Sequence, residues 1–458
     1  MKLEAIKSPG LAHNSYFLSD ANEALVVDPR RDGQIYNKLA QRECVKLKYI
    51  LETHRNEDFA IGSLQLQNTT DAQICHSKEL PFKYGENNLS DGETLRLGSL
   101  RIQVLYTPGH TNDSISFAIY QPENSSNPVF VFTGDTLFAG SVGRTDLYGA
   151  ANQQAQAEKL YASLNEKLLP LGDHVLVYPA HGAGSLCGNE IADEEYSTIG
   201  YEKKRNPFLN LNKEDFVKEA LREEMLVPPY FKKMEELNLN GPPILRSQET
   251  PPSLGIEEFK TEMNQSGTIV IDTRMPYAFA GSFIPNSLSI WLGGSAVYPG
   301  WLIDYDQRIL FVHERKEDMR RIARYFWRLG YDKMIGYLCN GINEWQEDGA
   351  PVDSLLTLSV HALKTKLAEN EVHLVDVREP HEWKADGFIE GAQRIFFGHL
   401  QKEAENIPRD KPIAVICSTG KRSSIGASIL KKKKFTEISN VLGGMTAWTK
   451  MGYPTRKD

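Results

Sequence analysis

The chain has 458 residues, of which 41% are hydrophobic and 24% charged, a composition typical of a globular protein with two or three domains. Its 52 Lys and Arg against 60 Asp and Glu give a net charge of −8, which argues against a general role in binding nucleic acid or membrane surfaces. No apolar run approaches the roughly 18 residues that a membrane-spanning helix needs.

The N-terminal sequence and the cysteines indicate where in the cell the protein is expected. The start, "MKLEAIKSPG", lacks the apolar core of a signal peptide. The five cysteines form no CxxC pair; they are Cys44, Cys75, Cys187, Cys339 and Cys417. We therefore expect a cytoplasmic protein with free thiols, each of which is a candidate for chemistry.

Short apolar strands separated by turns dominate residues 1 to about 120, for example "EALVVDP", "LKYILET" and "SISFAIY". Amphipathic stretches such as "NQQAQAEKLYASLNEKLLP" lie between or after them. This pattern predicts sheet layers covered by helices. The Pro-, Gly- and Ser-rich stretch "NGPPILRSQETPPSLG" then marks the best domain boundary.

Beyond this boundary the sequence repeats itself. A shift of 104 residues takes Asp272 to Asp376 and Arg274 to Arg378. A shift of 103 relates four more residues, Gly341, Trp345, Gly349 and Pro351, to Gly444, Trp448, Gly452 and Pro454. The repeat predicts two copies of one α/β module. We place the domains at 1–245, 252–352 and 353–458.

In the second copy, the apolar strand "PIAVIC" ends at Cys417 and leads through "STGKR" into a helix. In this geometry the backbone N–H groups of the loop and the positive end of the helix dipole converge on the sulfur. Lys421 and Arg422 add positive charge. Together these groups are expected to stabilise an anionic sulfur, in place of the buried packing thiol that a lone cysteine usually is.

The segments "VDVREPHEW", "GFIEGA", "CSTGKRS" and "LGGMTAW", in this order, resemble a rhodanese domain. The resemblance implies that Cys417 carries a sulfane sulfur as a persulfide, cradled by the backbone of 418–422 and by Arg422. In the first copy His313 stands at the position of Cys417, in the glycine-free loop "HERKED". We interpret 252–352 as a pseudo-rhodanese domain with a packing role.

Four loops of the N-terminal region each carry metal-binding types of side chain next to an apolar stretch. They are "THRNEDF" with His54 and Asp58, "YTPGHTNDS" with His110, "VFTGDTLF" with Asp135, and "VYPAHGAG" with His181. Because side chains at strand ends can converge at one edge of a sheet, these residues are candidates for one metal centre.

The four loops resemble the metallo-β-lactamase fold over about residues 1–240, which implies an αββα sandwich ahead of the two α/β rhodanese domains. In that family the first loop would read H-x-H-x-D-H and help to form two zinc pockets. Asn56 and Phe59 stand here in place of two of those histidines. Each pocket therefore lacks one imidazole, and a two-zinc hydrolase is not expected.

His54, His110 and Asp135 remain, two imidazoles and one carboxylate. Such a facial triad holds non-haem Fe(II) and leaves positions open for O2 and a thiolate. Persulfide dioxygenases of this fold bind one iron through residues that match these three. The resemblance implies one Fe(II) per chain, with zinc as the alternative, while Asn56, Asp58 and His181 support the ligands or mark a second site.

Two more residues are expected near this centre. Arg144, in "GRTDL", is a candidate for binding a substrate carboxylate, with a surface ion pair as the rival interpretation. Cys187, six residues past His181, either receives or relays a sulfane sulfur or is a small packing thiol.

The sequence thus predicts an enzyme of sulfane-sulfur metabolism. It would oxidise a low-molecular-weight thiol persulfide to sulfite with iron and O2, and exchange sulfur with thiosulfate-type substrates through Cys417. Two alternatives stay open. One is a rhodanese sulfurtransferase whose N-terminal domain is only a scaffold, and the other is a thioester hydrolase of the glyoxalase II kind. A homo-oligomer is compatible with the sequence.

Overall fold

The computed structural model describes residues 1–123, 125–188, 190–222, 225–245 and 249–457. The chain divides into two compact units, each considered by itself: the first comprises 1–248 with 327–330, and the second comprises 249–326 and 331–458. Among the helices of the described ranges, none is long and apolar enough to cross a membrane.

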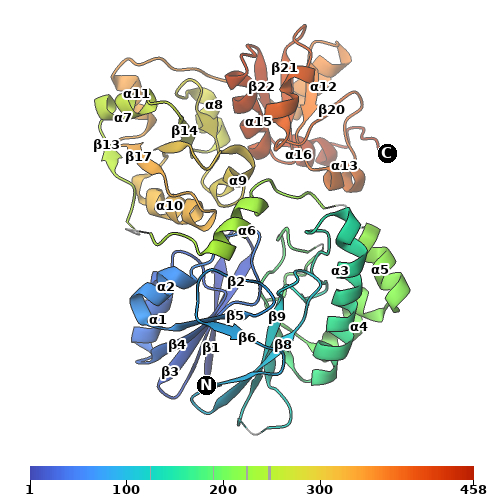
Figure 1. Ribbon diagram of the computed structural model, residues 1–458. Coiled ribbons are helices and arrows are strands. Elements are labelled where there is room, and N and C mark those ends of the chain that lie inside the picture. Colours follow the sequence, from blue (N-terminus) through green and yellow to red (C-terminus); the bar gives the residue numbers. More distant parts are fainter. Residues whose placement is uncertain (124, 189, 223–224, 246–248, 458) are drawn as a thin grey trace. The chain divides into compact units, whose positions relative to one another are not determined.

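Two six-stranded sheets form the first unit (Figure 1). One sheet has the order β1-β2-β3-β4-β5-β6, with strands Lys2–Ser8, His13–Asp20, Glu23–Val27, Lys46–Leu51, Gln73–Ser77 and Asn87–Leu89. The other has the order β12-β11-β10-β9-β8-β7, with strands Ser197–Thr198, Leu176–Pro179, Phe130–Gly134, Ile115–Tyr120, Leu100–Tyr106 and Thr94–Leu97.

The two sheets pack face to face. Leu25 and Val27 of the first sheet share one buried cluster with Phe117 and Phe132 of the second. The α-helices among the described residues of this unit are α1 Gln34–Arg42, α2 Ser63–Thr70, α3 Ala150–Ala162, α4 Ile199–Arg205, α5 Lys213–Arg222 and α6 Phe231–Asn240. Helices α1 and α2 lie on one side of the sandwich and α3 and α5 on the other (Figure 1). The predicted αββα fold is confirmed.

The second unit contains two five-stranded parallel sheets of the same topology, β13-β17-β16-β14-β15 and β18-β22-β21-β19-β20. The strands of the first are Ser253–Leu254, Met334–Leu338, Arg308–Val312, Thr268–Asp272 and Leu288–Ser289. Those of the second are Leu356–Leu358, Ile438–Val441, Ile413–Ile416, His373–Asp376 and Gln393–Arg394. The equal strand order confirms that one α/β module occurs twice.

Ten helices connect and cover these strands. In the first repeat they are α7 Ile256–Met263, α8 Pro276–Gly281, α9 Pro299–Leu302, α10 Met319–Arg328 and α11 Ile342–Glu347. In the second they are α12 Val360–Ala368, α13 Pro380–Asp386, α14 Leu400–Glu403, α15 Lys421–Lys432 and α16 Gly444–Lys450.

The repeated Asp-x-Arg pattern is a buried ion pair at the end of β14 and of β19. Arg378 donates from Nη2 to Asp376 Oδ2 at 2.7 Å and to the carbonyl of Gly387. Arg274 and Asp272 make the same contact at 2.6 Å in the first repeat. Because a buried charge is stable only when paired, neither residue of the pattern can vary alone.

The repeated tryptophan and proline are also in contact. Trp345 Nε1 donates to the carbonyl of Pro351 at 2.8 Å, and Trp448 Nε1 to that of Pro454 at 3.0 Å. This hydrogen bond links the last helix of each module to the segment that follows it, which explains why the tryptophan and the proline are six residues apart in both repeats.

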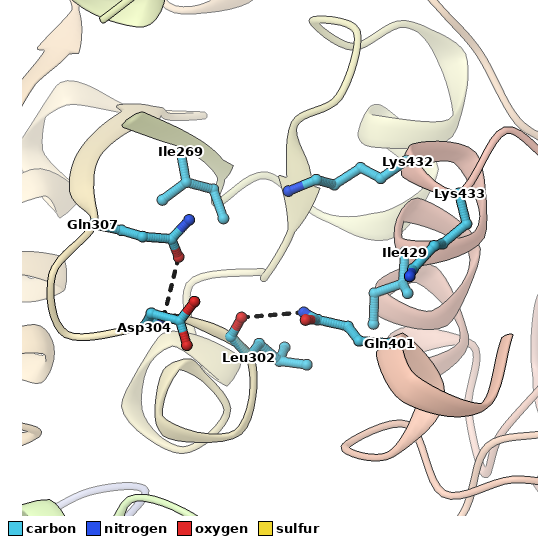
Figure 2. Close-up of a pocket in the computed structure, with 8 residues that line it drawn as sticks. All are labelled: Ile269, Leu302, Asp304, Gln307, Gln401, Ile429, Lys432 and Lys433. Atoms are coloured by element: carbon cyan, nitrogen blue, oxygen red, sulfur yellow. Dashed lines mark hydrogen bonds between the residues drawn. The ribbon is translucent and has the colours of Figure 1, made fainter. Parts of the chain in front are cut away.

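The two repeats pack against each other within the second unit. Ser289 Oγ lies 2.9 Å from Ser424 Oγ, and the Trp301 and Phe396 rings meet with centroids 4.9 Å apart. A pocket between them is closed at one side by the bond from Gln401 to the Leu302 carbonyl (Figure 2). Its other lining residues are Ile269, Asp304, Gln307, Ile429, Lys432 and Lys433, so it includes no cysteine.

Candidate metal centre and thiol site

The predicted metal-binding residues of the first unit follow the strand ends. His54 lies three residues after β4, Asp135 directly follows β10, and His181 lies two residues after β11. His110 stands in the loop between β8 and β9. All four side chains are buried, with relative exposures of 0–2%. The sheet edges therefore bring together residues from four separate loops.

Three of these side chains surround one point. The Nε2 atoms of His54 and His110 lie 3.7 and 3.4 Å from Asp135 Oδ2. Neither Nε2 atom has a hydrogen-bond partner among the described residues. Burial lowers the pKa of His54 to about 3, so its imidazole is neutral. Although burial opposes the charge, the carboxylates of Glu57 and Asp135 raise the pKa of His110 in the metal-free protein. Two imidazole nitrogens beside a carboxylate fit a divalent metal ion, which would take the place of that proton.

The opposite ring nitrogens are held by the protein. His110 Nδ1 lies 2.9 Å from the carbonyl of Arg144, an acceptor, so Nδ1 carries the proton. His54 Nδ1 lies 2.9 Å from the Thr53 hydroxyl, whose own proton goes to Asp28 at 2.7 Å. In its neutral form each ring thus presents an unprotonated Nε2 to the centre, in the arrangement by which outer partners orient metal-binding histidines.

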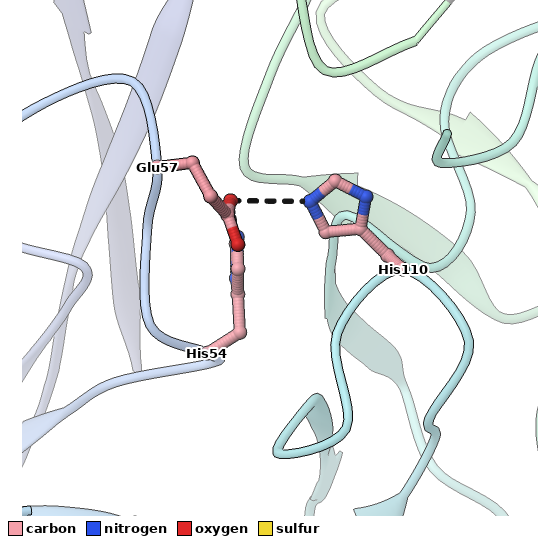
Figure 3. Close-up of side chains that lie close together, drawn as sticks. All are labelled: His54, Glu57 and His110. Atoms are coloured by element: carbon pink, nitrogen blue, oxygen red, sulfur yellow. Dashed lines mark ion pairs between the residues drawn. The ribbon is translucent and has the colours of Figure 1, made fainter. Parts of the chain in front are cut away.

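Sequence reasoning missed one residue of this centre, Glu57. Its Oε2 lies 3.4 Å from His110 Nε2 and 3.7 Å from His54 Nε2, and its side chain is fully buried (Figure 3). Burial raises the pKa of Glu57 to about 7. An acidic residue inside a loop of predicted metal ligands could have indicated Glu57 as a ligand. In the family pattern H-x-H-x-D-H, however, this position is one of the unspecified ones.

His181 and Asp58 form a separate pair beside the centre. His181 Nε2 lies 2.9 Å from Asp58 Oδ2, and its Nδ1 lies 2.8 Å from Asp135 Oδ1. Although burial opposes the charge, the two carboxylates hold the pKa of His181 well above its usual range. Asp58 thus contacts His181, and through it the Asp135 carboxylate.

The two residues in place of loop histidines have ordinary structural surroundings. Asn56 donates from Nδ2 to the carbonyl of His54 at 3.2 Å. The Phe59 ring is buried and packs on the His13 ring, with centroids 4.0 Å apart. An amide that faces its own loop and an aromatic ring do not complete a second zinc pocket.

Cys187 lies beside the centre, as the resemblance to the metallo-β-lactamase fold implies. Its Sγ lies within 4.8 Å of ligand atoms of His110 and Asp135, and of Asp58 and His181. Burial raises the pKa of the thiol well above its usual range, so without a bound ion it stays protonated.

Arg144 has no free donor for the expected substrate carboxylate. Its guanidinium is buried and donates to both oxygens of Asp146, each at 2.6 Å, and to the carbonyls of Leu186 and Leu226. With its own carbonyl facing His110, this residue fixes the loop around the centre.

The second repeat places Cys417 directly after β21, with α15 starting four residues later. The Gly420 N–H donates to Sγ at 3.2 Å, and the Ser423 hydroxyl lies 3.4 Å from it. Gly420 has a φ of +97°, and a Cβ there would lie 3.2 Å from the Val441 carbonyl oxygen. The loop therefore needs glycine in order to aim its N–H at the sulfur.

The basic residues of this loop have different surroundings. Arg422 donates to Glu382 and, at 2.8 Å, to the Ser418 hydroxyl, so its guanidinium is tied to the rim of the loop. Lys421 is exposed, with Nζ 5.8 Å from the centroid of the Trp291 ring in the first repeat.

The first repeat keeps the backbone of this site without its chemistry. His313 is buried against Tyr337, with ring centroids 5.2 Å apart. A Cβ on Gly341 would lie 2.8 Å from the His313 carbonyl oxygen, and one on Gly444 would lie 2.1 Å from that of Cys417. Both glycines thus allow the same close approach of two turns, although only the second turn holds a thiol.

The Glu382–Arg422 pair predicts a dependence of stability on pH. Burial alone would raise the pKa of Glu382, but Arg422 lowers it to about 2. Since an unfolded glutamate titrates near pH ~4.3, the ionised pair stabilises the fold above that pH by about 1–3 kcal/mol and loses this effect as the pH falls towards 2. Glu382→Gln should therefore lower the melting temperature at pH 7, and by roughly half as much at pH 3. An equal difference at both pH values would contradict this assignment.

Two family models match the chain. Residues 8–181 match the metallo-β-lactamase superfamily, and residues 256–348 and 359–451 each match the rhodanese-like domain. In a crystal structure titled a metallo-β-lactamase of Staphylococcus aureus, 98% of that chain aligns with 74% of this one, at 27% identity and a TM-score of 0.66.

Relatives of the N-terminal half have two different activities. A mitochondrial persulfide dioxygenase of Bos taurus is 30% identical over 247 residues, which cover 52% of this chain and 86% of the relative. A hydroxyacylglutathione hydrolase of Haemophilus influenzae is 29% identical over 232 residues, which cover 46% of this chain and 99% of the relative. The chain belongs to the metallo-β-lactamase superfamily, as a member that continues into two rhodanese-like domains.

Proposed function

We propose that the N-terminal domain is an iron-dependent persulfide dioxygenase and that the last domain transfers sulfane sulfur through Cys417. The dioxygenase reaction converts a thiol persulfide, O2 and water into the thiol, sulfite and two protons. The small thiol, the iron and the coupling between the two activities are all parts of this proposal.

One observation carries the proposal: the unpartnered Nε2 atoms of His54 and His110 face the Asp135 carboxylate. This donor set suits one Fe(II), which when bound would supply the redox chemistry between O2 and sulfur. The similarity to the Bos taurus persulfide dioxygenase supports the same choice.

The chain's own residues orient the ligands and limit access of water. Thr53 and the Arg144 carbonyl fix the two rings, as the hydrogen bonds to their Nδ1 atoms show. The fully buried surroundings would shield a reactive persulfide from bulk water. Cys187 lies close enough to contact the substrate sulfur, and we assign it to that wall of the site.

In the second activity, the Cys417 thiolate attacks the outer sulfur of a donor such as thiosulfate. The new S–S bond forms as the bond to sulfite breaks, so that sulfite leaves with the electron pair. A small thiol then accepts the sulfur as its own persulfide and releases Cys417. The Gly420 N–H, at 3.2 Å from Sγ, stabilises the negative charge in both steps.

A second candidate is a sulfurtransferase with an inert N-terminal scaffold, which the replacement of two loop histidines by Asn56 and Phe59 favours. Metal removal separates the two. An Fe(II) chelator, applied anaerobically, should abolish O2 uptake with glutathione persulfide and leave thiosulfate-to-thiol transfer intact. Iron-loaded protein that takes up no O2 before chelation, while transfer is active, would exclude the dioxygenase and favour the scaffold hypothesis.

A further inference from the structure

Glu57 differs from the other buried carboxylates around it. Glu52 accepts two contacts from the Tyr84 hydroxyl at 2.8 and 3.0 Å, and Asp28 accepts from the Thr53 N–H and hydroxyl. Neither oxygen of Glu57 accepts a hydrogen bond within the described part of the chain. Its nearest polar neighbours are the Nε2 atoms of His54 and His110 (Figure 3). A fully buried carboxylate without donors is costly unless a cation lies beside it.

The neighbouring atoms are themselves acceptors. When each ring is neutral its proton sits on Nδ1, so both Nε2 lone pairs point to the same space as the carboxylates of Glu57 and Asp135. The Nε2 atoms lie 3.4–3.7 Å from one oxygen of each carboxylate. Metal–ligand bonds of about 2.0–2.2 Å put neighbouring ligand atoms at about 3–3.6 Å, so the spacing suits one shared ion.

The loop backbone explains why residue 57 faces inward. Asn238 of α6 donates from Nδ2 to the carbonyls of Asn56, at 2.7 Å, and of Phe59, at 2.8 Å. Its Oδ1 accepts the Ile61 N–H at 2.9 Å. These three bonds clamp both ends of the Glu57 segment. Because Asn56 Nδ2 donates to the His54 carbonyl of the same loop, the Glu57 side chain is the one that faces His54 and His110.

We propose that Glu57 is a fourth protein ligand of the same metal ion, so that the centre is built from His54, Glu57, His110 and Asp135. The assignment deepens the proposed function, since it concerns the ion on which that function rests. A second carboxylate adds negative charge and oxygen ligation, which favours Fe(II) or Mn(II) over soft ions. It also takes one of the positions that three ligands leave open, so fewer remain for substrate and O2.

Metal binding tests this directly, without turnover. Mn(II) affinity is measured by the EPR signal of free Mn(II), and the coordination by the visible spectrum of the Co(II) form. Glu57→Gln should weaken Mn(II) binding by at least ~100-fold, beyond the ~10–100-fold of outer partners, and should alter the Co(II) bands. Glu52→Gln is the matched control, because Glu52 is a buried carboxylate of the same segment whose oxygens accept from the Tyr84 hydroxyl. It should leave both readouts unchanged.

The melting temperature of the metal-free protein tests the same assignment independently. If Glu57 is a ligand, an amide in its place relieves the repulsion between acceptors, so metal-free Glu57→Gln melts no lower than wild type and gains much less on adding Mn(II). If Glu57 only pairs with a protonated His110, the variant melts lower and binds Mn(II) normally, which would overturn the inference. Glu57→Asp, which keeps the charge but retracts the oxygens, should also bind Mn(II) weakly. Since no readout is turnover, a failed dioxygenase assay leaves this result unaffected.

Discussion

Replacing Cys417 by serine is expected to lower thiosulfate-to-thiol transfer by at least ~1000-fold, because the sulfur that forms the persulfide is gone and a hydroxyl cannot replace it. The oxygen atom would occupy nearly the same place, next to the Gly420 N–H that lies 3.2 Å from the sulfur. The fold should therefore be retained. O2 uptake with glutathione persulfide supplied from outside should stay at the wild-type rate.

The half-buried Cys339 offers a matched control in the first repeat. Cys339→Ser removes one thiol of the same unit outside the Cys417 loop, and it should transfer sulfur normally. Retained transfer in the Cys417 variant would mean that another thiol carries the sulfur, and Cys187 would be the first to examine.

Replacing His110 by alanine should abolish the dioxygenase activity and leave sulfur transfer intact. The variant loses an imidazole whose Nε2 lies 3.4 Å from both Asp135 and Glu57, which leaves two buried carboxylates without that partner. We expect iron content to fall and O2 uptake with glutathione persulfide to drop by more than ~100-fold, while thiosulfate transfer is unchanged. Iron is measured by metal analysis, and O2 uptake with an electrode, on anaerobically loaded protein.

His76 provides the control for the cavity that alanine creates. It is a buried histidine of the same unit, stacked on Phe82 with ring centroids 4.1 Å apart, and it belongs to none of the metal-type clusters among the described residues. His76→Ala should keep its iron and its O2 uptake. Equal losses in the two variants would mean that His110 acts through folding alone.

The fold could be predicted from the sequence because its signals are local or repeated. The Asp-x-Arg pairs and the tryptophan–proline contacts each bind residues a few positions apart, so they recur at constant spacing. The convergence of His54, His110 and Asp135 follows from strand ends that share one edge of a sandwich. These features do not depend on distant details of packing.

The missed features depend on long-range contacts. Glu57 faces inward because Asn238, far along the chain, clamps the loop. The Arg144 guanidinium is saturated by carbonyls of Leu186 and Leu226, which no local pattern indicates. A comparison with family motifs also directs attention to the positions that the motif names, and position 57 is not one of them.

O2 consumption by anaerobically iron-loaded protein supplied with glutathione persulfide tests most directly whether the "THRNEDF" loop holds the iron of a dioxygenase. We predict one sulfite formed for each O2 consumed, and loss of both in His54→Ala. No O2 uptake by the iron-loaded wild type, with Cys417-dependent sulfur transfer intact, would contradict this prediction and leave the chain a sulfurtransferase.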